Sequence, residues 1–231
     1  MKMSPKSPRR IPEDKLRPNV DYARQQFGVL ERDFQTVVEY VALDEKHLNV
    51  YSFRLADLIV RTGPEILRLF ELYLFNPNRS QIFHLQPESK KVIMDLQIKK
   101  HDRRDSFMDY LRAFRKFRIS GLNWAVEVKP LDKFITPFTT ETREINGRRI
   151  DAVFWWEDGY NALRHRVIER FEESATLGHA LFSLAGLWIL HDTMDRDWGR
   201  VGLANSDIFG RITHISPDIQ QIDHLDWGES Q

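Results

Sequence analysis

The stretch FWWEDGYNALRHRVIERFEESATLGHALFSLAGLWILH, residues 154–191, decides how this chain should fold. Its first half repeats large apolar side chains at spacings of three and four, which predicts a helix with one buried face (Trp156, Tyr160, Leu163 and Val167). Its second half, from Ala175, is apolar on nearly every side. His179 and Ser183 interrupt that run, which is shorter than the roughly 20 residues a membrane span needs. We therefore expect a buried core helix and no membrane association.

The segments before this stretch are also mainly helical. One apolar stripe predicts a first helix beginning at Val20 (Phe27, Leu30, Phe34, Val37 and Val41). A second helix is expected from about Val50 to the stop signal at residues 76–78. Because proline removes a backbone donor, we expect a kink or a new helix at Pro64. A third helix carries Phe107, Tyr110, Leu111 and Phe114.

A small amount of β structure is expected between and after these helices. Residues 119–128 and 134–144 are rich in β-branched and aromatic side chains, and Asn146 with Gly147 is a turn signal. Residues 208–215 also read as a strand. The predicted fold is mainly α, an antiparallel helical bundle with a small β element.

The composition favours one domain with loose ends. The 231 residues suit a single domain over 20–231, following a flexible basic tail over 1–19 and ending in a loose polar extension. The 34 basic and 34 acidic residues cancel, so only local patches can attract nucleic acid. Cysteine is absent, which rules out disulfides, zinc–thiolate sites and thiol catalysis. No pattern for a metal or cofactor is apparent.

Polar chemistry is concentrated on the first helix of the opening stretch. On a regular α-helix Asp158, Asn161 and His165, at i, i+3 and i+7, lie on one face, and Arg164 and Arg166 flank the histidine. A histidine exchanges a proton near neutral pH and an arginine holds a phosphate. These groups are the parts needed to cleave an RNA phosphodiester, with a second histidine supplied by a symmetric dimer. The alternative is structural, since such side chains commonly hydrogen-bond to neighbouring segments.

The same residues resemble the HEPN superfamily, and more narrowly the HEPN-like proteins of bacterial abortive-infection and toxin–antitoxin loci. The resemblance covers roughly residues 118–195 and rests on a tryptophan pair, a Tyr-Asn step, a histidine between arginines, and Phe171 before an Ala/Leu-rich helix (Trp155, Trp156, Tyr160, Asn161, Arg164, His165 and Arg166). It implies an up-and-down bundle in the cytoplasm that forms a homodimer around the motif helix.

The resemblance also implies roles for individual residues. Active members share a metal-independent ribonuclease site with the pattern Arg, polar residue, three residues, His. Asn161 and His165 match the polar and histidine positions and become the expected catalytic pair, whereas Tyr160 occupies the arginine position. The expected substrate-binding residues are Arg164, Arg166, Asp158 and Tyr160. The implied function is RNA cleavage in phage defence or as a toxin, the latter with an antitoxin partner. The alternative is a catalytically inactive domain that dimerises or binds a protein or RNA partner.

Overall fold

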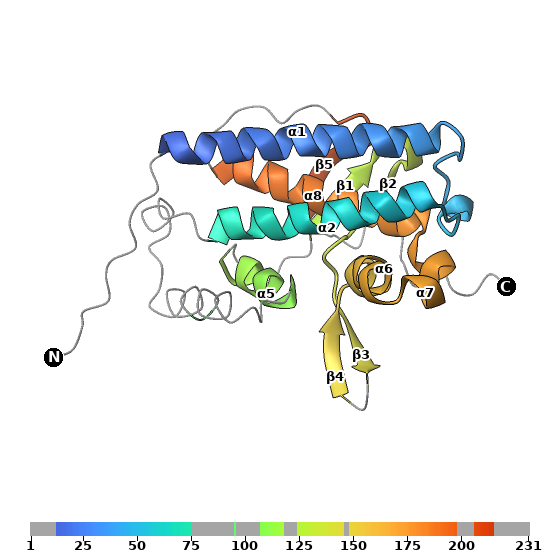
Figure 1. Cartoon of the computed structure of the whole chain (residues 1–231). Coiled ribbons are helices and arrows are strands. Elements are labelled where there is room, and N and C mark those ends of the chain that lie inside the picture. The colour runs from blue at the N-terminus through green and yellow to red at the C-terminus, as the bar shows by residue number, and fades with distance from the viewer. Residues whose placement is uncertain are drawn as a thin grey trace.

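The chain folds around three long helices, with a small sheet and a projecting hairpin (Figure 1). The computed structural model describes residues 13–74, 95, 107–117, 124–145, 148–197 and 206–214. The helices are α1 (Glu13–Val38), the 3-10 helix η1 (Glu45–His47), α2 (Phe53–Leu74), α5 (Phe107–Phe117), the π-helix η3 (Trp155–Asn161), α6 (Ala162–His165), α7 (Val167–Ser174) and α8 (Leu177–Asp197). A further 3-10 helix, η2 (Lys129–Leu131), joins the first two strands.

Helix α8 is the centre of the core. Every side chain from residue 174 through residue 193 is buried, which confirms the predicted core helix. Among the residues that the structure describes, no helix is long and apolar enough to cross a membrane.

The three long helices do not simply alternate in direction. Phe27, early in α1, packs on Trp188, late in α8, with ring centroids 5.2 Å apart, so these two helices are antiparallel. By contrast, Tyr51 pairs with Thr176 where α2 and α8 begin, and Ile66 reaches Gly186 near their middles. Helices α2 and α8 therefore run in the same direction, which departs from a strictly antiparallel order.

Helix α2 continues through Pro64 without starting a new helix there. Pro64 is exposed, and Val60, whose carbonyl loses its helical donor, is 38% exposed. Water can satisfy that carbonyl, so the proline costs less than it would on the buried face. The prediction of a new helix at this point is wrong.

Within the described residues, the β structure forms two separate antiparallel sheets. Strand β1 (Trp124–Val128) lies between β2 (Lys133–Ile135) and β5 (Phe209–His214), while β3 (Glu141–Ile145) pairs with β4 (Arg148–Ala152). The buried carboxylate of Glu31 on α1 accepts a hydrogen bond from Ser206, which in turn accepts the backbone N–H of Phe209 at 2.7 Å. This relay fixes the start of β5 against α1. The prediction of a mainly α fold with a small β element is confirmed.

The predictions for the two ends of the chain agree with the structure only in part. Helix α1 begins at Glu13, so residues 13–19, expected in a flexible tail, are helical. Residues 1–12, and the polar extension expected over residues 218–231, lie outside the described part of the chain.

Candidate functional site

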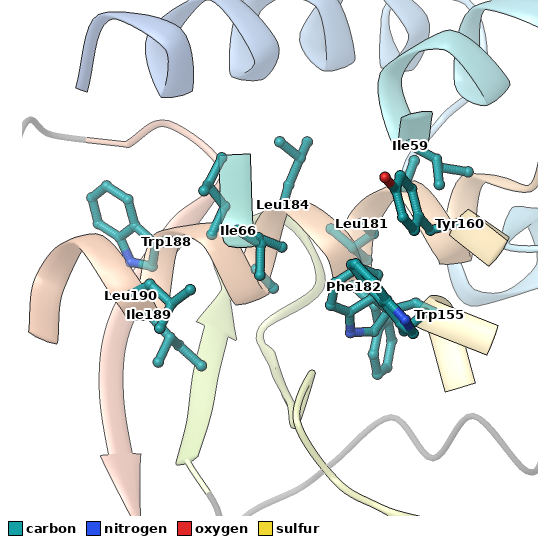
Figure 2. Packing of buried hydrophobic residues seen from close by; sticks show 14 of the residues in the cluster. Ile59, Ile66, Trp155, Tyr160, Leu181, Phe182, Leu184, Trp188, Ile189 and Leu190 are labelled. Atoms are coloured by element: carbon teal, nitrogen blue, oxygen red, sulfur yellow. The ribbon is translucent and has the colours of Figure 1, made fainter. Parts of the chain in front are cut away.

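The first part of the motif segment is a π-helix, not the regular α-helix that the spacing predicts. Trp155 and Trp156 are adjacent in sequence, yet both are buried. Trp156 stacks on Phe107 with ring centroids 4.1 Å apart, and the indole N–H of Trp155 donates to the carbonyl of Pro137 at 2.6 Å. The wider turn of a π-helix lets two consecutive large side chains enter the core together. Figure 2 shows Trp155 among the buried side chains that surround α8.

The π-helix lies close against α8 at Gly159. A Cβ added there would be 3.1 Å from the Cβ of His179, so only a glycine fits without displacement. His179 stacks on Phe154 at 4.4 Å, and its Nδ1 lies 2.8 Å from the hydroxyl of Thr176. Burial lowers the pKa of His179 to about 4, so its imidazole is neutral at physiological pH.

Tyr160 belongs to the core. It is 3% exposed, and its ring lies so close to α2 that a Cβ at Gly63 would be 2.3 Å from Cε2. The ring also packs on Trp156 at 4.4 Å. Arg164, one turn later, donates from Nη1 to the Tyr160 hydroxyl at 3.2 Å, and its Cζ is 5.3 Å from the ring centroid. Tyr160 thus connects the packing of α2 to an exposed arginine.

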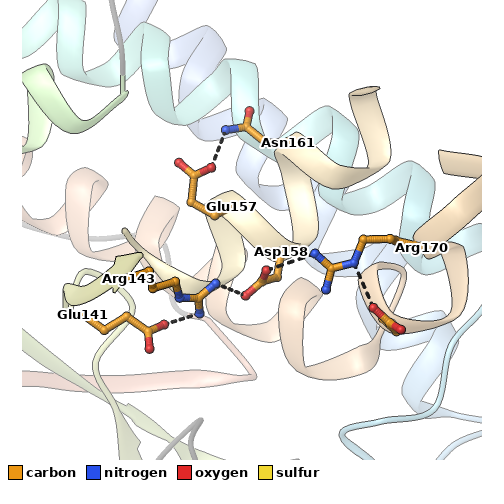
Figure 3. A network of polar contacts seen from close by, with 7 residues as sticks. Glu141, Arg143, Glu157, Asp158, Asn161 and Arg170 are labelled. Carbon is orange, nitrogen blue, oxygen red and sulfur yellow. Dashed lines mark hydrogen bonds and ion pairs between the residues drawn. The ribbon is translucent and has the colours of Figure 1, made fainter. Parts of the chain in front are cut away.

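Asp158 takes part in an ion-pair network rather than in a shared face with His165 (Figure 3). Its carboxylate accepts from Arg143 of β3 and lies 3.5 Å from Nη1 of Arg170 on α7. Arg143 also pairs with Glu141, and Arg170 with Glu173 at 2.9 Å. The network holds the hairpin, the π-helix and α7 together.

Asn161 points away from Asp158 in Figure 3. Its amide Nδ2 donates to the carboxylate of Glu157 at 3.2 Å. Asn161 is therefore bonded to the preceding turn of its own helix.

Arg164, His165 and Arg166 form an exposed group at the junction of α6 and α7, which we call the basic corner. Helix α6 ends at His165, and Arg166 has φ −140° and ψ 34°, which interrupts the helix. All three side chains are exposed to solvent. The imidazole of His165 makes no hydrogen bond or ion pair to the part of the chain that the structure describes, so it is open to a ligand on that side.

Comparison with known proteins adds no relative. No family model, curated protein or solved structure matches the chain. The function must be argued from the residues themselves.

The structure brings together only part of the predicted site. Arg164, His165 and Arg166 share the surface, whereas Tyr160 is buried and Asp158 and Asn161 bind other groups. Within the described residues, no group of three His, Asp or Glu side chains is arranged to hold a metal.

The sequence does not indicate the partners of Asp158, which are Arg143 and Arg170. Arg143 is 15 residues away on a separate strand, and no local spacing indicates that pairing. Arg170 lies 12 residues beyond Asp158, across the helix break at Arg166, so helical periodicity does not reveal it either.

Proposed function

We propose that this chain is a helical domain that acts on RNA through its basic corner. The observation that carries the proposal is the exposure of three successive side chains, two of them arginines, at a break between helices. Arginine forms paired hydrogen bonds to phosphate oxygens, and a histidine between two arginines is placed to exchange a proton with a bound phosphodiester.

Cleavage requires more than one chain provides. The base that activates the 2′-hydroxyl and the acid that protonates the leaving oxygen are two separate groups, and the corner holds one histidine. A homodimer that brings two basic corners together would supply both. The resemblance of residues 154–191 to HEPN-like ribonucleases, which implies an antitoxin partner and a cytoplasmic role in phage defence, supports this proposal, although the parallel α2 and α8 depart from the up-and-down bundle that it also implies.

Tyr160 bears directly on cleavage because it occupies the position of the motif arginine. The guanidinium of Arg164 rests on the Tyr160 hydroxyl, so a positive charge stands at the outer end of that side chain. We propose that Arg164 provides the charge that stabilises the phosphate in the transition state.

A second candidate is a catalytically inactive domain that binds a protein or RNA partner. It is favoured by the burial of Tyr160 in the core, where an arginine would be costly, and by the lack of a described group that orients His165. Under this alternative the basic corner binds a partner but does not react.

The two candidates differ in what they do to RNA. We would incubate the purified protein with mixed RNAs in EDTA and compare the wild type with His165→Ala. Cleavage by the wild type alone supports the ribonuclease. Unchanged RNA with both proteins rules out metal-independent cleavage.

Binding is measured separately by fluorescence anisotropy with Arg164→Ala and Arg166→Ala. The control is Arg32→Ala, which removes an exposed arginine from α1. Weaker binding for the corner variants, but not for the control, supports RNA recognition at the corner. Equal binding by all four proteins would contradict it.

A further inference from the structure

A group of exposed apolar side chains lies where α2 and α7 meet. Ile168 is 95% exposed, Phe53 83% and Tyr51 45%, and the ring of Phe171 lies against Phe53 at 4.6 Å and Tyr51 at 6.2 Å. We call these three rings, together with Ile168 three residues before Phe171 on α7, the α2–α7 surface. Large apolar side chains gathered in this way on a surface usually mark a binding site.

The backbone holds this surface in place. Ser52 N-caps α2 by accepting the N–H of Leu55 at 3.2 Å, and its own N–H donates to the carbonyl of Ala175. The N–H of Leu177 donates to the carbonyl of Val50 at 2.8 Å. The aromatic rings are therefore presented by a fixed edge and not by a free loop.

The α2–α7 surface is next to the basic corner along the chain. Ile168 is two residues beyond Arg166, and the exposed Arg54 follows Phe53. Figure 1 shows α7 beside the N-terminal end of α2. Arg54 and Arg166 thus lie in the same two segments as the exposed side chains.

The acidic side chains of α7 are mostly engaged. Glu172 accepts a hydrogen bond from the Tyr51 hydroxyl at 2.9 Å, and Glu173 pairs with Arg170. All three glutamates are exposed and repel phosphate, and Glu169 has no ion-pair partner among the described residues.

We propose that the α2–α7 surface stacks bases of single-stranded RNA whose phosphates contact Arg54, Arg164 and Arg166. This inference rests on the proposed function and names its substrate class. Exposed aromatic rings beside cationic side chains are the combination that binds single strands, because every base offers a flat face for stacking. In duplex RNA those faces are already stacked within the helix, so Phe53 discriminates against it.

The test uses fluorescence anisotropy with a labelled single strand of about 12 nucleotides and a duplex of the same sequence. Phe53→Ala should weaken binding of the single strand by about 10-fold, a typical loss for one stacked base. Phe53→Tyr, which keeps an aromatic ring, should bind the single strand as tightly as the wild type. Phe53→Leu, which has no ring, should bind it as weakly as Phe53→Ala. The matched control is Tyr40→Ala, which removes an aromatic ring that is also 83% exposed. The duplex should bind more weakly than the single strand.

Glu169→Gln gives an independent check, because this variant should strengthen RNA binding whereas Phe53→Ala should weaken it. Removing this carboxylate should tighten binding of the single strand by about 2-fold, an effect that fades as salt increases. Because Phe53 and Glu169 are exposed, their variants should keep the circular dichroism spectrum and thermal midpoint of the wild type.

Each outcome decides between specific statements. Unchanged binding by Phe53→Ala, with loss in Arg164→Ala, overturns stacking and leaves RNA recognition at the corner intact. If Phe53→Leu binds RNA as tightly as the wild type, the contact is apolar and does not require stacking, and the inference is overturned. Binding of the duplex as tight as that of the single strand would also overturn it. If the wild type binds no RNA, both proposals fail. Sedimentation of Phe53→Ala would then show whether the surface joins two copies of the chain.

Discussion

Two buried histidines should make the stability of this protein fall steeply in mildly acidic solution. Burial lowers the pKa of His179 to about 4. Burial, followed by the positive charges of Arg24 and Arg68, lowers the pKa of His191 to about 3. In the unfolded chain both return to about 6.5. Below that pH the unfolded state binds protons that the folded state does not, so acid favours unfolding.

The size of the effect follows from the difference in proton uptake. Between about pH 7.5 and 5.5, each histidine becomes protonated in the unfolded chain but stays neutral in the folded one. The free energy of unfolding should therefore fall by about 1.3 kcal/mol for each histidine, or about 2.7 kcal/mol for both. Ordinary carboxylates titrate near pH 4, so this window separates the histidines from general acid denaturation.

Urea denaturation at a series of pH values measures this fall. His179→Leu and His191→Leu should each remove about half of the pH dependence, and the double variant nearly all of it. His165→Gln, which alters an exposed imidazole, should behave as the wild type does. The reasoning is refuted if the free energy of unfolding of the wild type changes by less than about 1 kcal/mol over this window, or if the double variant keeps the full slope.

Three further substitutions, and one control in α1, test the packing around the motif segment. Gly63→Ala should destabilise the protein by about 1–3 kcal/mol, because the added Cβ would collide with the Tyr160 ring. The control Gly28→Ala has open space around it and should stabilise the protein by about 0.5–1 kcal/mol. A urea midpoint that rises for both variants would contradict this reasoning. Tyr160→Arg, which restores the motif residue, should cost roughly 3–5 kcal/mol because it buries a charge, and a thermal midpoint equal to the wild type would be inconsistent with a core role. Asp158→Asn should cost about 1 kcal/mol and speed amide exchange in β3, and unchanged exchange would show that its pairing with Arg143 does not hold the hairpin.

Much of the fold was predictable because it depends on patterns that repeat locally. The apolar stripe from Phe27 onward places α1 against the core, and the nearly continuous apolar run after Ala175 places α8 at its centre. The directions of the helices were not predictable in this way. Helices α2 and α8 are separated by about a hundred residues, and only their packing, as at Ile66 and Gly186, shows that they run parallel.

The candidate site was less predictable because its backbone is irregular. The spacing of Asp158, Asn161 and His165 indicates one face only if each residue turns by the α-helical angle. Here the first two lie in or at the end of a π-helix and the third precedes a break at Arg166. The spacing of residues in the sequence shows which side chains are available. It cannot show a change of helix type that comes with the packing of two adjacent tryptophans.

The burial of Tyr160 explains how a core residue influences the surface. Gly63 and Trp156 fix the ring, and the hydroxyl then accepts a hydrogen bond from Arg164. An arginine at position 160 would have to bury its own charge in this contact. With tyrosine there, the ring fills the core and the charge is carried one turn later by Arg164, beside His165. The same segment thereby combines tight packing on α2 with a cationic group in water, which is the arrangement that the proposed RNA contact needs.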